Sequence, residues 1–285
     1  MTASSRHPDA LEAASKTVGV LRPRLLSVVK ALVVPVSALG LWVGLSEAHV
    51  VGSIFLPSPQ ALWSVAKAIG PQLPSAYGIS LRMVFGGLAI GSVSGITVGL
   101  LFGYSKVARD VFELTLDTIR PIPIFALIPL FILWFGIGVW PQTALVSLGV
   151  FLILSFTTIE AVRSLPRIYV RAALTCGASR FQIYRTVVLP AIVPNLVVGI
   201  RYGAIAAWGL DVAAEFSGSE QGLGYIMIIR EEYLDTAGIV LVVLIFCLSA
   251  IILDRSLRYV GRFLMPWNPR IAEKGFIAEL LGGGA

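Results

Sequence analysis

Long apolar segments alternate with shorter polar connections along most of the chain. Six of the apolar segments approach or exceed the roughly 20 residues that an α-helix needs to cross a bilayer. The predicted fold class is therefore an all-α integral membrane protein with six transmembrane helices. We place these spans at about 28–48, 79–104, 120–135, 143–159, 191–215 and 237–253.

Three further stretches are apolar or amphipathic and are predicted not to cross the membrane. Residues 61–69 and 222–234 are too short to span it. The first stretch is expected to lie on the membrane surface, and the second to dip into the outer face or lie on it. Residues 107–119 form an amphipathic connection. The predicted organisation is an N-terminal tail, a transmembrane domain and a C-terminal tail, at 1–26, 27–265 and 266–285.

The composition agrees with a membrane protein. Charged residues make up 13% of the chain, whereas a soluble domain carries about 25%. Of the 22 Lys and Arg residues, 18 fall in or beside the two tails and in the connections after the second and fourth predicted spans. All these segments lie on one side of a six-span protein, and the positive-inside rule makes that side cytoplasmic. Both termini and the segment 171–190 are therefore expected in the cytoplasm. The basic charge indicates topology, and no nucleic-acid partner is expected.

Residues that enzymes and metal sites require are scarce. The chain has two histidines, His7 and His49, and two cysteines, Cys176 and Cys247. We therefore predict no metal site and no disulfide framework. The sequence motifs of hydrolases are absent, so no catalytic residue is assigned. None of the five lysines follows a glycine, as the phosphate-binding loop of ATPases requires. Any ATP must be bound by another subunit.

The polar segment 171–190 is predicted to form a helix, a break and a second helix. Gly177 interrupts the first helix, and Ser179 with Gln182 matches the capping box that starts the second. Pro190 is expected to end it. One face of the second helix is apolar and suits a groove in another protein. This face consists of Phe181, Tyr184, Val187 and Val188.

The same segment resembles the cytoplasmic EAA loop of ABC importer permeases. In that loop Glu-Ala-Ala is followed at fixed distances by a glycine, an isoleucine and a closing Leu-Pro. Arg171 stands where the family has Glu, so the ion pair of that Glu is not expected here. The matched positions are Ala172, Ala173, Gly177, Leu189 and Pro190, with Val187 in place of isoleucine.

Shorter motifs extend the resemblance over residues 55–265, to the branch of these permeases that takes up nitrate, sulfonates and taurine. Their order and spacing along the chain carry the resemblance. They are Leu56-Pro57-Ser58-Pro59, Ser80-Leu81-Arg82, Arg120-Pro121-Ile122-Pro123, Pro129-Leu130, Trp134-Phe135-Gly136-Ile137-Gly138, Ala213-Ala214-Glu215 and Gly222-Leu223-Gly224.

The resemblance implies a type I ABC importer permease fold in a bacterial cytoplasmic (inner) membrane. It implies two ATPase subunits, which bind the ATP and Mg²⁺, and an external solute-binding protein. It also implies a second permease chain. We expect another copy of this chain, because a single chain supplies one EAA-like loop, and a heterodimer with a related permease is the alternative. The chain itself is expected to carry no cofactor.

Residues 178–188 would then form a coupling helix seated in a groove of the ATPase. We expect Phe181 and Tyr184 to fill the groove. Arg180 and Arg185 either contact its rim or serve only as cytoplasmic charges beside the lipid headgroups. The full set of expected coupling residues is Ala172, Ala173, Gly177, Ala178, Ser179, Arg180, Phe181, Tyr184, Arg185, Leu189 and Pro190.

Two more groups of residues lie inside the predicted spans. A glycine at every fourth position of the second span predicts close packing of a neighbouring helix, namely Gly87, Gly91, Gly95, Gly99 and Gly103. Ionisable residues in the membrane are costly and indicate function. These ionisable residues and their polar or aromatic neighbours are expected to line the translocation pathway. The expected pathway residues are Ser80, Arg82, Arg201, Tyr202, Trp208, Asp211 and Glu215.

A structural alternative for these ionisable residues is that Arg82 or Arg201 pairs with Asp211 or Glu215. We favour pairing for Arg201 and Glu215 and a pathway role for Asp211. A small anion is the expected cargo, with an aliphatic sulfonate or taurine first and nitrate or bicarbonate next. The alternative functions are an ion-coupled carrier or channel and an intramembrane enzyme.

Overall fold

The computed structural model describes residues 32–48, 50–105, 107, 111, 114–115, 118–119 and 121–265. The predicted tails at 1–26 and 266–285, and most of the connection at 107–119, lie outside these residues. The chain divides into two compact units, which are Met1–Ser58 with Trp267–Ala285, and Pro59–Pro266.

The described part of the first unit contains one apolar helix, Leu32–Glu47. After this helix the chain turns, and the indole Nε1 of Trp42 donates a hydrogen bond of 3.1 Å to the carbonyl of Pro57.

The described residues of the second unit are helices and short connections, with no strand. Two short helices, α2 (Pro59–Ile69) and α10 (Leu223–Glu232), coincide with the stretches predicted to be too short to span. The other elements are α3 (Leu73–Tyr104), η1 (Ile124–Leu127), α5 (Ile128–Phe135), α6 (Val139–Arg163), α7 (Arg167–Thr175), α8 (Arg180–Ile183), η2 (Tyr184–Val188), α9 (Leu189–Phe216) and α11 (Thr236–Leu264).

Four helices are long and apolar enough to cross a membrane, and each coincides with a predicted span. They are Leu73–Tyr104, Val139–Arg163, Arg180–Phe216 and Thr236–Leu264. The first and third predicted spans fall on shorter apolar helices, Leu32–Glu47 and Ile124–Phe135. The number of six spans therefore stays a prediction.

The glycine stripe of α3 lies directly against α6. A Cβ built at any of its five positions would come within 3.0 Å of an atom of α6. At Gly91 the nearest atom is the carbonyl oxygen of Ser147, at 2.5 Å, and at Gly95 it is the carbonyl oxygen of Phe151, at 2.6 Å. The two backbones thus approach as closely as the spacing of the glycines predicts.

Helix α9 contacts α3, α6 and α11 and occupies the centre of the unit. Its small residues allow this contact, since Gly203 lies against Leu154 of α6 and Leu88 of α3. On the side facing α11, the indole of Trp208 meets the ring of Phe246 edge-on, with 5.8 Å between centroids.

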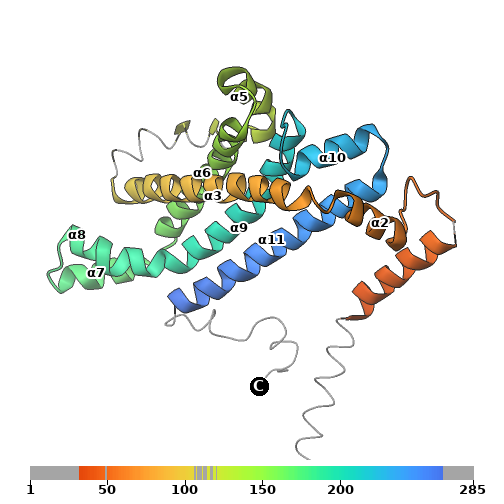
Figure 1. Cartoon of the computed structure of the whole chain (residues 1–285). Coiled ribbons are helices and arrows are strands. Elements are labelled where there is room, and N and C mark those ends of the chain that lie inside the picture. Colours follow the sequence, from red (N-terminus) through yellow and green to blue (C-terminus); the bar gives the residue numbers. More distant parts are fainter. Residues whose placement is uncertain are drawn as a thin grey trace, which may run out of the picture. The chain divides into compact units, whose positions relative to one another are not determined.

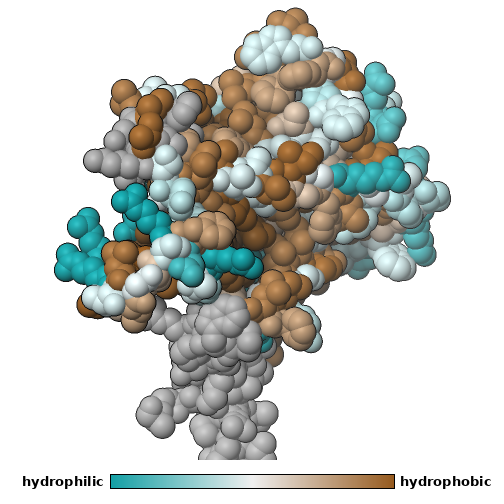
Figure 2. All heavy atoms as spheres, turned by 90° about the vertical axis from the view of Figure 1, so that its left-hand side faces the viewer, coloured by the Kyte–Doolittle hydropathy of each residue, from teal (hydrophilic) through white to brown (hydrophobic). Residues whose placement is uncertain are grey.

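The polar connections of this unit lie at its two ends. Figure 1 shows α7 and α8 at one end and α10 at the opposite end, with α3, α9 and α11 running between them. Figure 2 looks from the side of α7 and α8. It shows hydrophobic side chains over much of the surface and hydrophilic side chains gathered in separate groups, as expected of a protein whose middle lies in lipid.

Candidate functional site

The hairpin formed by α7, α8 and the residues between them, 167–183, has the predicted helix, break and helix. Helix α7 ends in a Schellman motif, in which the N–H of Gly177 donates to the carbonyl of Leu174 and the N–H of Ala178 to that of Ala173. Gly177 has φ = +78°, a conformation that glycine adopts without steric cost.

The predicted capping box starts α8. The backbone N–H of Ser179 donates to the Gln182 side chain at 2.8 Å, and the N–H of Gln182 donates to the Ser179 hydroxyl at 3.3 Å. Two backbone donors of the first turn are thereby satisfied. Local sequence signals alone therefore predict the fold of this hairpin.

The second helix of the hairpin does not end where Pro190 predicts. From Arg180 to Phe216 the chain forms one continuous helix of 37 residues, which passes from α8 through the π-turn η2 into α9. Pro190 has no backbone N–H, and in a regular α-helix its ring would press on the carbonyl four residues earlier. The wider π-turn directly before it lets the helix continue. The expected stop at Pro190 was therefore wrong.

The apolar face of this helix is turned partly inward, toward its own chain. The hydroxyl of Tyr184 donates to the carbonyl of Leu100 at 2.6 Å, and its ring meets Tyr104 edge-on at 5.0 Å. Val188 is buried, while Phe181 is 63% exposed. In this conformation the hydroxyl and ring of half-buried Tyr184 are bonded and packed within the chain, and its expected place in a groove of the ATPase stays a prediction.

Other apolar side chains of the same hairpin are exposed as well. Ile168, Tyr169 and Leu174 of α7 are more than half exposed. The sequence analysis did not single them out, although their place in a short polar helix could have marked them. The remaining expected coupling residues are exposed or half-buried, namely Ala172, Ala173, Ala178, Ser179, Arg180, Arg185, Leu189 and Pro190.

Arg201, in the middle of the long helix, pairs with a residue that the sequence analysis did not consider. Its Nε lies 2.8 Å from Oδ1 of Asp254 in α11, and Arg258 lies 3.7 Å from the other carboxylate oxygen. Arg201 was expected to pair with Asp211 or Glu215, which was wrong. The predicted sixth span ended at 253, whereas α11 continues to Leu264 and carries Asp254 within it.

Glu215, at the end of α9 opposite the hairpin, joins three helices. One carboxylate oxygen accepts a hydrogen bond of 2.7 Å from the Ser80 hydroxyl of α3, and the other accepts one from the N–H of Gly224 in α10. The Ser80 oxygen in turn accepts from the N–H of Leu223 at 2.9 Å. Glu215 and Ser80 are both fully buried. Glu215 thus holds helices together, as favoured, but through hydroxyl and amide donors.

The other expected pathway residues separate into buried and exposed positions. Asp211 and Trp208 are buried in the core of this chain, and the Asp211 carboxylate has no hydrogen-bond partner among the described residues. Arg82 and Tyr202 are exposed, Tyr202 by 63%. Of these four residues, only Arg82 and Tyr202 can be reached from a pathway that lies outside this single chain.

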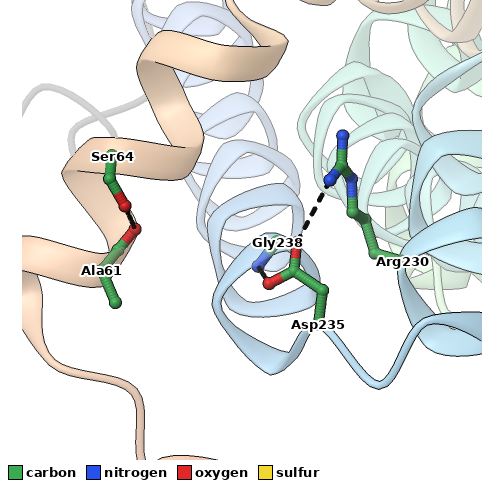
Figure 3. A network of polar contacts seen from close by, with 5 residues as sticks. All are labelled: Ala61, Ser64, Arg230, Asp235 and Gly238. Carbon is green, nitrogen blue, oxygen red and sulfur yellow. Dashed lines mark hydrogen bonds and ion pairs between the residues drawn. The ribbon is translucent and has the colours of Figure 1, made fainter.

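At the C-terminal end of α10 the chain turns into α11 through a charged corner (Figure 3). One oxygen of Asp235 accepts from the N–H of Gly238 at 3.0 Å and so caps α11, and the other accepts from Arg230 at 3.2 Å. On α2 the Ser64 hydroxyl bonds the carbonyl of Ala61 at 2.8 Å.

Residues 87–265, which include most of α3, the hairpin, α9, α10 and α11, match the protein family described as "Binding-protein-dependent transport system inner membrane component". The match covers more than half of the chain. The chain belongs to this family.

Named relatives give the family's context. This permease is 30% identical over 82% of its length to the taurine transport system permease protein TauC of Escherichia coli, 87% of which is covered. It is 28% identical over 84% of its length to the putative aliphatic sulfonates transport permease protein SsuC of Bacillus subtilis, of which 87% is covered.

A solved structure shares the fold. A chain of the MetNI methionine ABC transporter in an inward-facing conformation matches with a TM-score of 0.54 and 22% identity, over 67% of this chain and 98% of that chain. At this identity the likeness concerns the fold alone, which is that of an ABC importer permease.

This permease is thus a transport subunit of the bacterial inner membrane and not an enzyme. In ABC transporters of this kind a separate ATPase subunit hydrolyses ATP, and the permease works with that ATPase, a partner permease and a binding protein.

Proposed function

We propose that this permease forms the translocation pathway of an ATP-driven importer for a small sulfonate-type anion. Two copies of the chain assemble with two ATPase subunits, which hold the ATP and Mg²⁺. An external solute-binding protein delivers the anion. Both termini and the hairpin lie in the cytoplasm, where the ATPases are.

The observation that carries this proposal is the continuity of the hairpin with the central helix. The helix from Arg180 to Phe216 has 37 residues, and at 1.5 Å per residue it is about 55 Å long. The hydrocarbon core of a bilayer is about 30 Å thick, so this helix can cross the membrane and still project from it. A force applied to α8 then acts on α9 without an intervening flexible loop.

The contacts of this helix distribute the force through the unit. Near the hairpin Tyr184 binds α3, in the middle Arg201 binds α11, and at the far end Glu215 binds α3 and α10. Because packed helices switch between discrete arrangements, closure of the ATPases can rock these helices together and expose the pathway alternately to each side.

The exposed side chains of the hairpin are the surface offered to the ATPase. Phe181 provides the central apolar contact together with Leu174, and Arg180 and Arg185 lie beside it. Apolar anchors surrounded by charged residues are typical of stable protein interfaces. On the pathway side, Tyr202 and Arg82 are the candidates to contact the anion.

The choice of cargo rests on the relatives and on charge. The names of two relatives refer to taurine and to aliphatic sulfonates. A sulfonate carries a permanent negative charge that a guanidinium binds through charge-assisted hydrogen bonds, and Arg82 can supply one. Nitrate and bicarbonate are smaller anions that the same chemistry accommodates, and they rank next.

Reconstitution of the complete transporter tests the function. The chain is purified with its ATPase, placed in vesicles with ATP inside, and supplied outside with binding protein loaded with taurine, a longer alkanesulfonate, nitrate or bicarbonate. We expect ATP hydrolysis and uptake to rise with the sulfonates. Stimulation by nitrate or bicarbonate alone would contradict the choice of cargo. Failure of any ATPase to co-purify with the chain would contradict the function itself.

A further inference from the structure

A cavity of about 330 Å³ opens beside the Glu215 junction, at the end of the unit opposite the hairpin. Its walls come from the start of α3, the connection after α9, and α10. In the orientation proposed above, this end faces the outside of the cell. Neither the family match nor the contacts described so far assign a role to this cavity.

The lining of the cavity combines polar residues with apolar side chains. Gln72, Ser75, Glu220 and Gln221 are exposed polar residues of the lining. Buried or half-buried apolar side chains make up the remaining walls, namely Ala76, Ile79, Ile226 and Ile229.

The charge of this cavity is negative. Arg230 also lines it, but its guanidinium is bonded at 3.2 Å to Asp235, which caps α11 (Figure 3). Glu220, which precedes α10, has no ion pair among the described residues, and Glu231 and Glu232 are exposed at the end of α10. The charge of Arg230 is therefore neutralised by Asp235. The carboxylate of Glu220 remains at the cavity without a counter-charge among the described residues.

One lining residue connects the cavity with the Glu215 junction. Gly222 has φ = +104°, and a Cβ placed on it would lie 2.0 Å from the Glu215 carboxylate. The two residues that follow it donate their N–H groups to Ser80 and Glu215. A group that enters the cavity therefore contacts the segment that closes the outer ends of α3 and α9.

We propose that this cavity receives a lysine or arginine side chain from the external solute-binding protein. This inference rests on the proposed function. A basic side chain suits both kinds of lining residue, because its methylene stem covers apolar surface while its charged head binds acceptors. The carboxylate of Glu220 and the amide oxygens of Gln72 and Gln221 are such acceptors.

A charge reversal at Glu220 tests the inference in the reconstituted transporter. ATP hydrolysis is measured while the concentration of the solute-loaded binding protein is raised. In Glu220→Lys the new ammonium group repels the incoming side chain and can occupy the cavity itself. We expect the half-maximal concentration to rise about tenfold, which corresponds to about 1.4 kcal/mol, and Glu220→Gln to give a smaller rise.

Glu231→Lys is the matched control, since it makes the same change of charge on an exposed residue of α10 that does not line the cavity. It should stay within about twofold of the unmodified chain, because an exposed charge outside a contact has a small effect. Equal responses of Glu220→Lys and the unmodified chain would overturn the inference alone. If the binding protein does not stimulate even the unmodified complex, the proposed function fails, and the inference fails with it.

A photo-crosslinking amino acid at Tyr225 gives an independent readout. Tyr225 lines the cavity, whereas Tyr233 is 78% exposed near the end of the same helix and does not. We expect an adduct between position 225 and a segment of the binding protein that contains lysine or arginine. An adduct from position 233 but none from 225, or an adduct with a segment lacking basic residues, would contradict the proposal.

Discussion

The hydroxyl of Tyr184 donates a hydrogen bond of 2.6 Å to the backbone carbonyl of Leu100. This contact joins the π-turn after the hairpin to the last turn of α3, and the ring of Tyr104 supports it from the side. Since α3 lies against α6 through its glycines, we propose that movement of the hairpin reaches α6 as well as α9. In this proposal Tyr184 serves transmission within the chain, whereas the exposed Phe181 contacts the ATPase.

This division of roles predicts different effects of two substitutions. Phe181→Ala removes an exposed apolar side chain from the proposed ATPase interface, so the amount of ATPase that co-purifies with the chain should fall at least about tenfold, as for an interface anchor. Tyr184→Phe keeps the ring and removes one hydrogen bond, at a cost of about 1 kcal/mol. It should leave co-purification intact and lower the number of anions imported per ATP.

The control for both variants is Ser64→Ala, at an exposed position of α2 outside the hairpin, whose hydroxyl bonds a carbonyl of its own helix. It should behave as the unmodified chain in both assays. The assignment of the two aromatic residues is wrong if Tyr184→Phe loses the ATPase while Phe181→Ala retains it.

The ion pair of Arg201 with Asp254 should stabilise the contact of α9 with α11. Arg201→Met or Asp254→Asn is expected to lower the free energy of unfolding in detergent by about 1–2 kcal/mol, the range of interhelical polar contacts in membranes. The exchange Arg201→Asp with Asp254→Arg should restore at least half of the loss. Arg258→Met should have a smaller effect, because its contact of 3.7 Å is longer. Equal losses in the single and exchanged variants would contradict a direct pair.

The glycine stripe predicts that even one methyl group is too large between α3 and α6. Gly91→Ala or Gly95→Ala would place a Cβ within 2.6 Å of a backbone oxygen, which should cost about 1–3 kcal/mol by overpacking. Gly78→Ala, on the same helix with nothing within 4 Å of the added atom, is the matched control and should be neutral. Unfolding midpoints in detergent measure the difference. Equal midpoints for Gly95→Ala and Gly78→Ala would refute the close approach.

The buried junction at Glu215 predicts a local loosening of α10. Glu215→Ala leaves the buried N–H of Gly224 unpaired, at about 1–3 kcal/mol, and leaves the Ser80 hydroxyl only its longer contact of 3.4 Å with the carbonyl of Ala76. Hydrogen exchange over residues 222–232 should accelerate in this variant and remain unchanged in Glu231→Ala, whose side chain is exposed. Unchanged exchange in Glu215→Ala would show that other contacts hold α10.

Local signals made much of the fold predictable. Each of the four helices long enough to span coincides with an apolar stretch, and the break at Gly177 with the cap at Ser179 follows from interactions within a few residues. The glycines at every fourth position indicated a packed surface without naming the helix against it. Such features depend on neighbours in the sequence, so the sequence alone reveals them.

Two kinds of feature were not predictable in this way. They are contacts between residues far apart in the sequence, and the backbone adjustment before Pro190. Asp254 lies 53 residues from Arg201, and no local pattern relates the two. Tyr184 has the spacing of an outward apolar face, yet the end of α3 provides it with a carbonyl and a ring. Pro190 normally ends a helix, and only the π-turn before it allows the helix to continue. In each case an interaction in space, or an adjustment of the backbone, prevailed over the local rule.

Cysteine accessibility at the two ends of the long helix tests the central claim most directly. Phe181→Cys and Phe216→Cys are introduced separately into a chain whose exposed Cys176 and Cys247 are replaced by serine. In intact cells we expect position 181 to cross-link to the ATPase subunit and to resist a membrane-impermeant maleimide. Position 216 should react with the maleimide and form no such cross-link. Labelling of position 181 from outside, without a cross-link to the ATPase, would contradict the coupling of this helix to ATP hydrolysis.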